Sequence, residues 1–267
     1  MKSACGLASG IAFALVAFVI PLDVLAQTPT IPPLTSNRPG IGESEALVIP
    51  RALQVEAGGI FEGAPSTDER RWTETWGQLT FRYGVTRRIE IFGGWDGLSL
   101  DRVSALGVSR IVAGGNDLRV GAKLGLLTEE ANGLTVTISP SWSFPVGSEE
   151  FTSGSQDPSF RVMWSRSLLR DWSVSGNLLW VRTSDSIGRY WESGVTVGAT
   201  RGLTDTLAAF VEESSVLVTD RPNNWSIDGG VAWVVGLDLQ LDGSVGHTWL
   251  DEGGEWFVSA GITLRHR

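Results

Sequence analysis

Residues 118–126 read Leu-Arg-Val-Gly-Ala-Lys-Leu-Gly-Leu, and residues 256–264 read Trp-Phe-Val-Ser-Ala-Gly-Ile-Thr-Leu. In both stretches every second residue is apolar, and most of the residues between are polar or glycine. Successive side chains of a β-strand point to opposite faces, so this alternation predicts strands with one apolar face. The same pattern recurs in three further stretches, 134–144, 225–233 and 237–245.

A weaker alternation predicts seven more strands, near 52–61, 75–84, 87–95, 158–166, 171–181, 190–200 and 205–213. The predicted total is twelve strands. Most are about 9–11 residues long, which is the length that a tilted strand needs to cross a bilayer. An even number of strands is typical of single-chain bacterial barrels.

Tryptophan favours a membrane setting over a soluble β-sandwich, whose strands also alternate. The chain has 12 tryptophans. Indole rings prefer the boundary between lipid and water, so those near the predicted strand ends form an expected aromatic girdle. Its members are Trp76, Trp95, Trp142, Trp172, Trp180, Trp191, Trp225, Trp233 and Trp256.

The connections between the predicted strands alternate between short and long. The short ones are 84–87, 128–133, 167–170, 201–205 and 235–236, and the long ones are 62–74, 96–116, 145–157, 182–189, 214–224 and 249–255. Short periplasmic turns and long outer loops are typical of outer-membrane barrels, and an even strand number puts both termini on the periplasmic side.

In hydrocarbon an unpaired backbone N–H or C=O costs several kcal/mol, so spanning strands must close into a ring. The sequence therefore predicts an all-β fold, a transmembrane antiparallel up-and-down β-barrel of about 12 strands over residues 49–267. Its expected location is the bacterial outer membrane. A secreted β-sandwich is the alternative.

Residues 1–26 have the three parts of a secretory signal peptide: Lys2, an apolar core at 10–20 and small residues before a cleavage site after Ala26. An uncleaved membrane helix is the alternative, although a proline and an acid interrupt the apolar run. Cleavage removes Cys5, which is the one cysteine of the chain, so no disulfide is expected in the mature protein.

Residues 27–48 are expected to form an N-terminal periplasmic leader. This leader either reaches into the barrel, where Arg38 would pair with an acid of the lumen, or stays loose.

Residues 36–58 contain Arg38-Pro39, Ser44, Val48-Ile-Pro50 and Gln54-Val-Glu-Ala-Gly58, and residues 115–123 read Gly-Asn-Asp-Leu-Arg-Val-Gly-Ala-Lys. In these motifs the chain resembles an outer-membrane family named after the meta-cleavage pathway of phenol degradation, whose members are often labelled transporters. The family usually has Asp where Asn37 stands, and Arg51-Ala52 replaces a Pro-Gly step. The resemblance implies import of small compounds, often aromatic, across the outer membrane.

Strand parity assigns the side chains that face the lumen. The candidate pore-lining residues are Glu56, Gln78, Arg82, Arg88, Glu90, Arg119, Lys123, Arg161, Glu192, Asp228, Asp238 and Asp242. Bases concentrate in the first half of the strands and acids in strands eight to eleven, so opposite walls of a closed barrel carry opposite charge. We expect a transverse field that orients dipolar or zwitterionic solutes. With twelve strands, the lumen is either a narrow passage or a polar core closed by charge pairs.

The sequence offers little support for catalysis or for a cofactor. His247 faces lipid by parity, and Val245 and Trp249 stand where a Ser–His pair would need a serine. No Cys/His cluster indicates a metal site, and no phosphate loop or dinucleotide fingerprint is present. The net charge of −9 excludes a strongly basic nucleic-acid-binding protein.

We therefore expect a channel for passive uptake of small solutes, aromatic compounds among them, without catalytic residue, metal or cofactor. A closed barrel with a structural or surface-interaction role and a lipid-modifying outer-membrane enzyme are the alternatives. The expected partners are outer-membrane lipid, lipopolysaccharide, a small-molecule solute and the barrel-insertion machinery.

Overall fold

The computed structural model describes residues 32–65, 69–105, 108–128, 133–169, 171–185, 188–218, 223–250 and 253–267. The predicted signal peptide, residues 1–26, lies outside these residues. The described part contains fourteen strands: β1 (Leu53–Pro65), β2 (Glu69–Gly84), β3 (Ile89–Trp95), β4 (Leu98–Ala105), β5 (Val108–Gly115), β6 (Leu118–Leu127), β7 (Leu134–Phe144), β8 (Asp157–Leu169), β9 (Trp172–Asp185), β10 (Gly188–Gly202), β11 (Leu207–Val218), β12 (Asn224–Val234), β13 (Leu239–Leu250) and β14 (Gly253–His266). Among the described residues there is no helix long and apolar enough to cross a membrane.

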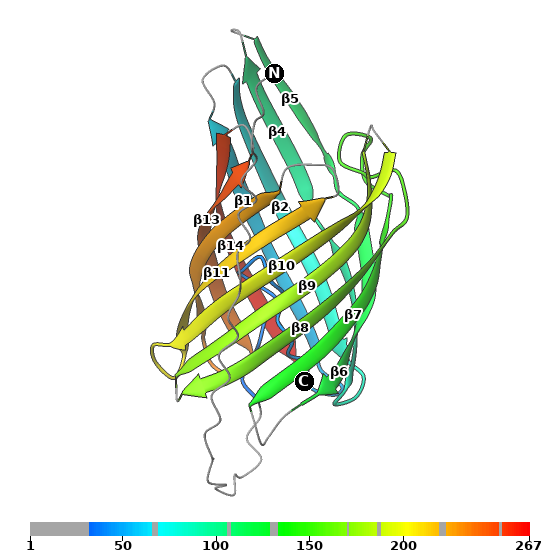
Figure 1. Ribbon diagram of the computed structural model, residues 1–267. Coiled ribbons are helices and arrows are strands. Elements are labelled where there is room, and N and C mark those ends of the chain that lie inside the picture. The colour runs from blue at the N-terminus through cyan, green and yellow to red at the C-terminus, as the bar shows by residue number, and fades with distance from the viewer. Residues whose placement is uncertain are drawn as a thin grey trace, which may run out of the picture. The chain divides into compact units, whose positions relative to one another are not determined.

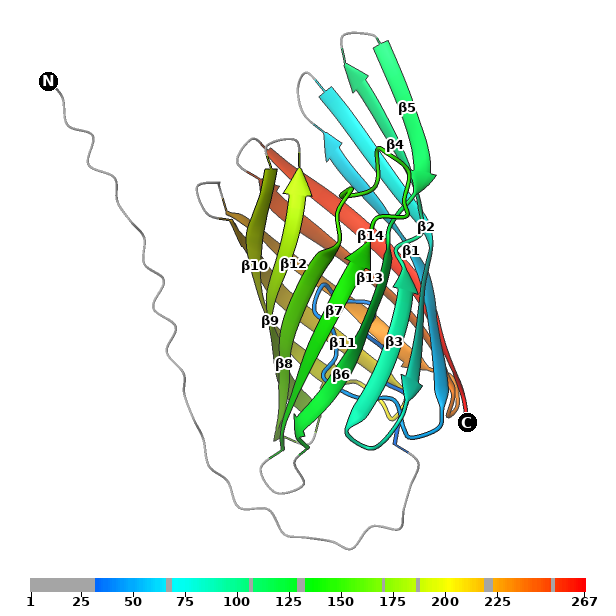
Figure 2. The ribbon, with the colours of Figure 1, turned by 90° about the vertical axis from the view of Figure 1, so that its right-hand side faces the viewer.

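Twelve of these strands close into a ring (Figures 1 and 2). Strand β1 pairs antiparallel with β2 on one side and with β14 on the other, from Leu53 opposite His266 to Gly63 opposite Trp256. Each of the other ring strands has two neighbours within the ring, in the order β2, β3, β6 and onward to β14. The ring itself therefore has no open edge, and the predicted twelve-stranded antiparallel barrel is confirmed.

Strands β4 and β5 form a hairpin that stands beyond the ring (Figure 2). Strand β4 pairs with the first half of β2, from Glu69 opposite Ala105 to Trp76 opposite Leu98, while β3 pairs with the second half. The prediction of a long loop at 96–116 is therefore wrong. Most of the expected loops at 62–74, 182–189, 214–224 and 249–255 are also strand. Outside the bilayer both faces of a sheet meet water, so backbone pairing continues where the apolar alternation has ended.

Gly77 is a bulge that reverses the parity of β2. Gly58 lies opposite Gln78, but Gly59 lies opposite Trp76, so Gly77 is left without a partner in the register. Its φ of 67° is in the left-handed region that glycine adopts at low cost. Trp76 therefore faces outward with 60 % of its surface exposed, whereas Gln78, two positions later, faces the lumen.

The barrel is apolar outside and polar inside. Seven of the nine predicted girdle tryptophans are exposed on the outer face; Trp95 and Trp256 are half-buried, the latter against Phe61 and Trp72. Few described apolar residues are fully buried, whereas the buried polar and charged residues are numerous and lie largely on inward-facing strand positions. This reversal is the arrangement expected of a barrel with lipid outside and a wet lumen.

Two glycines near the base of the hairpin give a matched test of the local geometry. Both have positive φ, 67° at Gly77 and 92° at Gly97, so replacement by alanine costs each about 1–2 kcal/mol of backbone strain. A Cβ at Gly77 meets open space, but one at Gly97 would stand 2.4 Å from the carbonyl oxygen of Trp76. We expect Gly97→Ala to destabilise the barrel more than Gly77→Ala, measured by urea unfolding in detergent. Equal losses would show that this close backbone approach is not formed.

Candidate functional site

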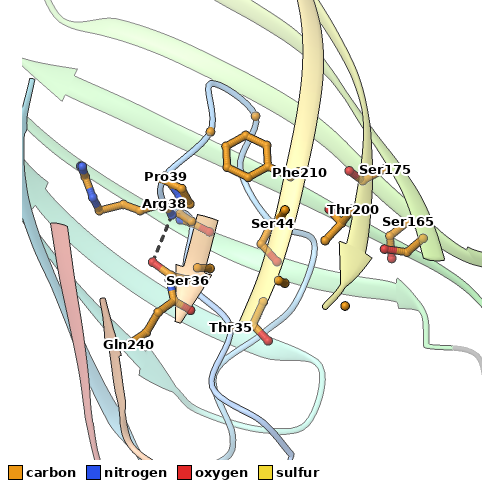
Figure 3. Close-up of a pocket in the computed structure, with 18 of the residues that line it drawn as sticks. Thr35, Ser36, Arg38, Pro39, Ser44, Ser165, Ser175, Thr200, Phe210 and Gln240 are labelled. Carbon is orange, nitrogen blue, oxygen red and sulfur yellow. Dashed lines mark hydrogen bonds between the residues drawn. The ribbon is translucent and has the colours of Figure 1, made fainter. Parts of the chain in front are cut away.

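Residues 32–48, called the inner segment below, run inside the ring. At its start the Pro32 carbonyl accepts a hydrogen bond from Arg265 on β14 at 3.2 Å. At its end the Val48 N–H donates to Glu90 on β3 at 2.8 Å. The larger cavity lies against this segment (Figure 3). The chain therefore carries a stretch of backbone through the lumen that its own wall side chains hold in place.

Arg82 is the centre of a fully buried charge cluster. Its guanidinium binds Glu90 in a bidentate manner, with Nε–Oε1 2.7 Å and Nη2–Oε2 3.0 Å. Its Nη1 donates to Glu56 at 2.7 Å, and its Nη2 donates to the Ala46 carbonyl at 2.8 Å. Two carboxylates thus pair with Arg82, and its hydrogen bonds to the Ala46 carbonyl and, at 3.4 Å, to the Thr35 carbonyl hold the inner segment to β2.

Arg38 of the inner segment contacts strands on both sides of β1, namely β2, β13 and β14. It donates to the Gln78 side chain at 3.0 Å, to the Ala260 carbonyl at 3.0 Å and to Asp242 at 3.4 Å. The guanidinium lies flat on the wall over two glycines: a Cβ at Gly58 would stand 2.4 Å from Arg38 Cζ, and one at Gly261 would stand 2.2 Å from Nε. These small residues leave the space that the close approach needs.

Glu43 of the inner segment faces the basic wall. Its Oε1 lies 3.2 Å from Arg119 Nη1 and 3.6 Å from Arg161 Nη2, and its Oε2 lies 3.9 Å from Lys123 Nζ. The positive charges of these three side chains favour the ionised form of the Glu43 carboxylate.

The lumen thus has two walls of opposite charge. Strands β2, β6 and β8 carry the bases Arg82, Arg119, Lys123 and Arg161, whereas β11, β12 and β13 carry the acids Glu212, Asp228 and Asp242. These groups of strands are on opposite sides of the ring order. The inner segment presents Glu43 to the first wall and Arg38 to the second, so its own charges complement the field across the lumen.

Three predicted pore-lining residues lie in turns or near the end of a strand. Arg88 is exposed in the turn before β3, because the strand begins at Ile89 rather than at 87. Asp238 is in the turn before β13, where it pairs with Arg265 at 3.0 Å and with Arg267. Glu192 is half-buried near the outer end of β10.

Asp228 is buried on the lumen side of β12, but its hydrogen bonding differs from that of the other lumen acids. Only 2 % of its surface is exposed, and neither of its carboxylate oxygens has a hydrogen-bond partner among the described residues. In the register it lies opposite Glu212, whose Oε1 accepts the Gly42 N–H at 2.8 Å.

Some of the residues that build the site were missed as candidates. Asn37 bridges two wall residues, with its N–H 3.2 Å from Glu56 and its Oδ1 2.7 Å from Lys123. Glu43 was missed as well. Strand parity applies only to residues in strands, so it could not identify Asn37 or Glu43. The sequence signal for Glu43 is its position as an acid five residues after Arg38, in a segment rich in Pro and Gly.

Two cavities flank the inner segment. The larger, of about 650 Å³, lies between the segment and strands β8 to β13, and its strand side includes hydroxyl side chains, among them Ser165, Ser175 and Thr200 (Figure 3). The smaller, of about 300 Å³, is lined by Gln78, Trp95, Arg119 and Arg161. Asn37, Arg38, Gly40 and Glu43 line both cavities, so the inner segment separates them.

His247 stands outside the lumen network. Its ring meets the edge of Trp249 at a centroid distance of 4.5 Å, and Trp249 stacks on Trp225 at 3.8 Å. It therefore belongs to the aromatic surroundings near the outer ends of β12 and β13. The described residues contain no group of three or more His, Cys, Asp or Glu side chains that could hold a metal ion.

A closed antiparallel barrel with an apolar exterior, a charged interior and an internal segment is a protein of the bacterial outer membrane. The chain belongs to the family described as "Putative MetA-pathway of phenol degradation", whose model matches residues 36–266. The family membership expected from the motifs at 36–58 and 115–123 is thereby confirmed.

Solved structures share the fold. The COG4313 outer membrane channel from Pseudomonas putida F1 is 16 % identical, with a TM-score of 0.63, and the match covers 86 % of this chain and 100 % of that chain. The NanC porin is 10 % identical, with a TM-score of 0.53 and coverage of 79 % and 98 %. The translocator domain of the autotransporter NalP from Neisseria meningitidis is 11 % identical, with a TM-score of 0.51 and coverage of 80 % and 88 %. No curated protein sequence matches the chain.

The buried cluster around Arg82 gives a test of what stabilises the barrel. Arg82→Met leaves Glu56 and Glu90 buried without their partner, which we expect to cost about 3–5 kcal/mol. The control is Arg71→Met, because Arg71 is 57 % exposed in its pair with Asp101 and an exposed pair contributes about 0–1 kcal/mol. Urea unfolding in detergent, followed by tryptophan fluorescence, compares the two. A loss no larger for Arg82→Met than for the control would contradict the buried cluster.

Proposed function

We propose that this protein is a passive outer-membrane channel for small solutes and that residues 36–46 of the inner segment act as its gate. The pair of cavities on the two sides of that segment is the observation that carries the proposal. A lumen that served only as a closed polar core would be filled by its own charge pairs. Here about 650 Å³ and 300 Å³ remain, separated by a single stretch of backbone.

The contacts that hold residues 36–46 to the barrel wall can be replaced by contacts with water. Leu34 and Val48 are buried apolar anchors at the two ends, whereas no apolar side chain between them is fully buried. Hydrogen bonds and ion pairs hold the middle, and each hydrogen bond to a charged group contributes only about 1.5–3 kcal/mol net because water replaces the partner that is lost. Residues 36–46 can therefore leave the wall without uncovering a hydrophobic core.

Single-ring aromatic compounds fit the surfaces that the two cavities offer. Phe210 lines the larger cavity and Trp95 the smaller, each among hydroxyl or charged groups. A few polar groups beside an aromatic surface are the usual make-up of a site for a small ring compound. The description of the family, which names a pathway of phenol degradation, favours the same class.

The surroundings of the barrel follow from its surface. The outer face meets membrane lipid through a belt of exposed apolar side chains, and we assign lipopolysaccharide to the outer leaflet around the girdle. The chain would reach this position with the help of the barrel-insertion machinery.

We propose no catalytic role for this protein. His266 is the last residue of β14, and His247 on β13 lies against Trp249 rather than beside a nucleophile.

A disulfide across the gate tests the proposal. A Cβ at Gly42 would lie 3.3 Å from Thr196 Cγ2, so the variant Gly42→Cys with Thr196→Cys brings two thiols within bonding reach. The predicted mature chain, residues 27–267, has no other cysteine. We expect planar-bilayer currents from this variant to be absent when it is oxidised and to return on reduction.

The two single-cysteine variants are the controls, and their currents should not respond to reductant. Equal currents from the oxidised and reduced double variant, with the disulfide verified by mass, would show that residues 36–46 do not need to move. Absence of current from every variant, each shown to be folded by heat-modifiable migration on a gel, would favour the closed structural barrel.

A further inference from the structure

The carboxylate of Glu43 occupies a place built to bind carboxylates. Three cations from two strands surround it: Arg119 and Lys123 on β6 and Arg161 on β8. Guanidinium groups bind carboxylates well because their donors match both oxygens at once. The inner segment thus fills a carboxylate site of the barrel with a side chain of its own.

The fit of Glu43 to this place is poor. Of its distances to the three cations, the 3.2 Å contact with Arg119 is a hydrogen bond, and the others are ion pairs of 3.6 Å and 3.9 Å. Charge-assisted hydrogen bonds of this type are normally about 2.7–2.9 Å. In addition, Arg119 Nε is buried without a hydrogen-bond partner among the described residues.

Arg82 shows what a satisfied guanidinium looks like in the same lumen. Its Nε and Nη2 both bind Glu90, Glu56 takes Nη1, and none of its side chain is exposed. Arg119, in contrast, has a free Nε and a side chain that is 32 % exposed. A carboxylate that is not tethered to the inner segment could bind Arg119 through two donors, which Glu43 does not do.

A solute can reach this position through the smaller cavity. Arg119 and Arg161 line its 300 Å³ together with Trp95, and Glu43 forms part of the same lining. Phe92 lies under the Arg119 guanidinium, 5.8 Å from its Cζ to the ring centroid. Asp96 and Glu56 also line the cavity, but Glu56 is already bound to Arg82.

We propose that the carboxylate of an entering solute, a small aromatic acid, takes the place of Glu43 on Arg119 and Arg161 and thereby releases the gate. The inference rests on the proposed channel function and names its trigger and its solute class. Once the arginines bind the solute, Glu43 is a buried carboxylate that keeps only its 3.9 Å ion pair with Lys123, and the loss of the other two cations is costly in a poorly hydrated site. The segment lowers this cost by moving Glu43 into water, and the passage between the two cavities opens.

The experiment records single-channel currents of residues 27–267 in a planar bilayer while benzoate is added to either side. Benzyl alcohol, which has the same ring without the charge, is the matched probe. We expect the open probability to rise with benzoate concentration to a plateau and to stay unchanged with benzyl alcohol. The variant Glu43→Gln should be open without benzoate, by about tenfold or more over the parent as expected for loss of one charged hydrogen bond, and should no longer respond.

Glu45 provides the control on the same segment. Its carboxylate accepts a hydrogen bond from the Ser165 hydroxyl at 2.7 Å and belongs to the larger cavity. The amide oxygen of a glutamine can still accept the Ser165 hydrogen bond, so we expect Glu45→Gln to respond over the same range of benzoate concentration as the parent, and Arg161→Gln to shift the response to higher benzoate concentration.

The outcomes separate this inference from the channel function itself. Currents from the parent that ignore benzoate, or currents from Glu43→Gln that still rise with benzoate, would overturn the trigger and leave the channel standing. An equal response to benzyl alcohol would overturn recognition of the carboxylate. A complete lack of current from all of these folded proteins would overturn the channel function and the trigger together.

Discussion

The need to pair every backbone N–H and C=O within the bilayer is the constraint on which the rest of this structure depends. Twelve antiparallel strands meet it by closing at the pairing of β1 with β14. Closure in lipid puts the apolar faces outside and leaves the polar faces to enclose the lumen. The interior is therefore built from charges and hydroxyls, and each buried charge needs a partner.

The inner segment supplies many of those partners. Its Glu43 faces the basic wall and its Arg38 faces the acidic wall, so one short stretch of chain neutralises part of both. The two sets of contacts differ in quality. The cluster of Arg82 with Glu56 and Glu90 is short and fully buried, which suits a structural role. The contacts of Glu43 are longer and border a cavity, which suits a part that moves.

The strands of the ring were predictable because lipid outside and water inside impose a strict period of two. Predicted and observed ranges agree closely at 118–126 and 134–144, and differ mainly where strands run beyond the bilayer. The hairpin of β4 and β5 escaped prediction because both of its faces are wet. Parity also placed Arg82, Lys123 and Asp242 in the interior. It did not place Arg88, since a shift of two residues in the start of β3 is enough to move it into a turn.

By itself the sequence determined the fold class, the number of ring strands, the opposite charge of the two walls and the family, because each depends on local pattern or on motifs. Only the tertiary structure decided which charges meet. Arg38 lies 204 positions from Asp242 in the chain, and Glu43 lies 76 from Arg119, and such pairs depend on ring closure and on the path of the inner segment. Gly77 is an example within a single strand, because only the structure shows the bulge that decides which of its neighbours faces lipid and which faces the lumen.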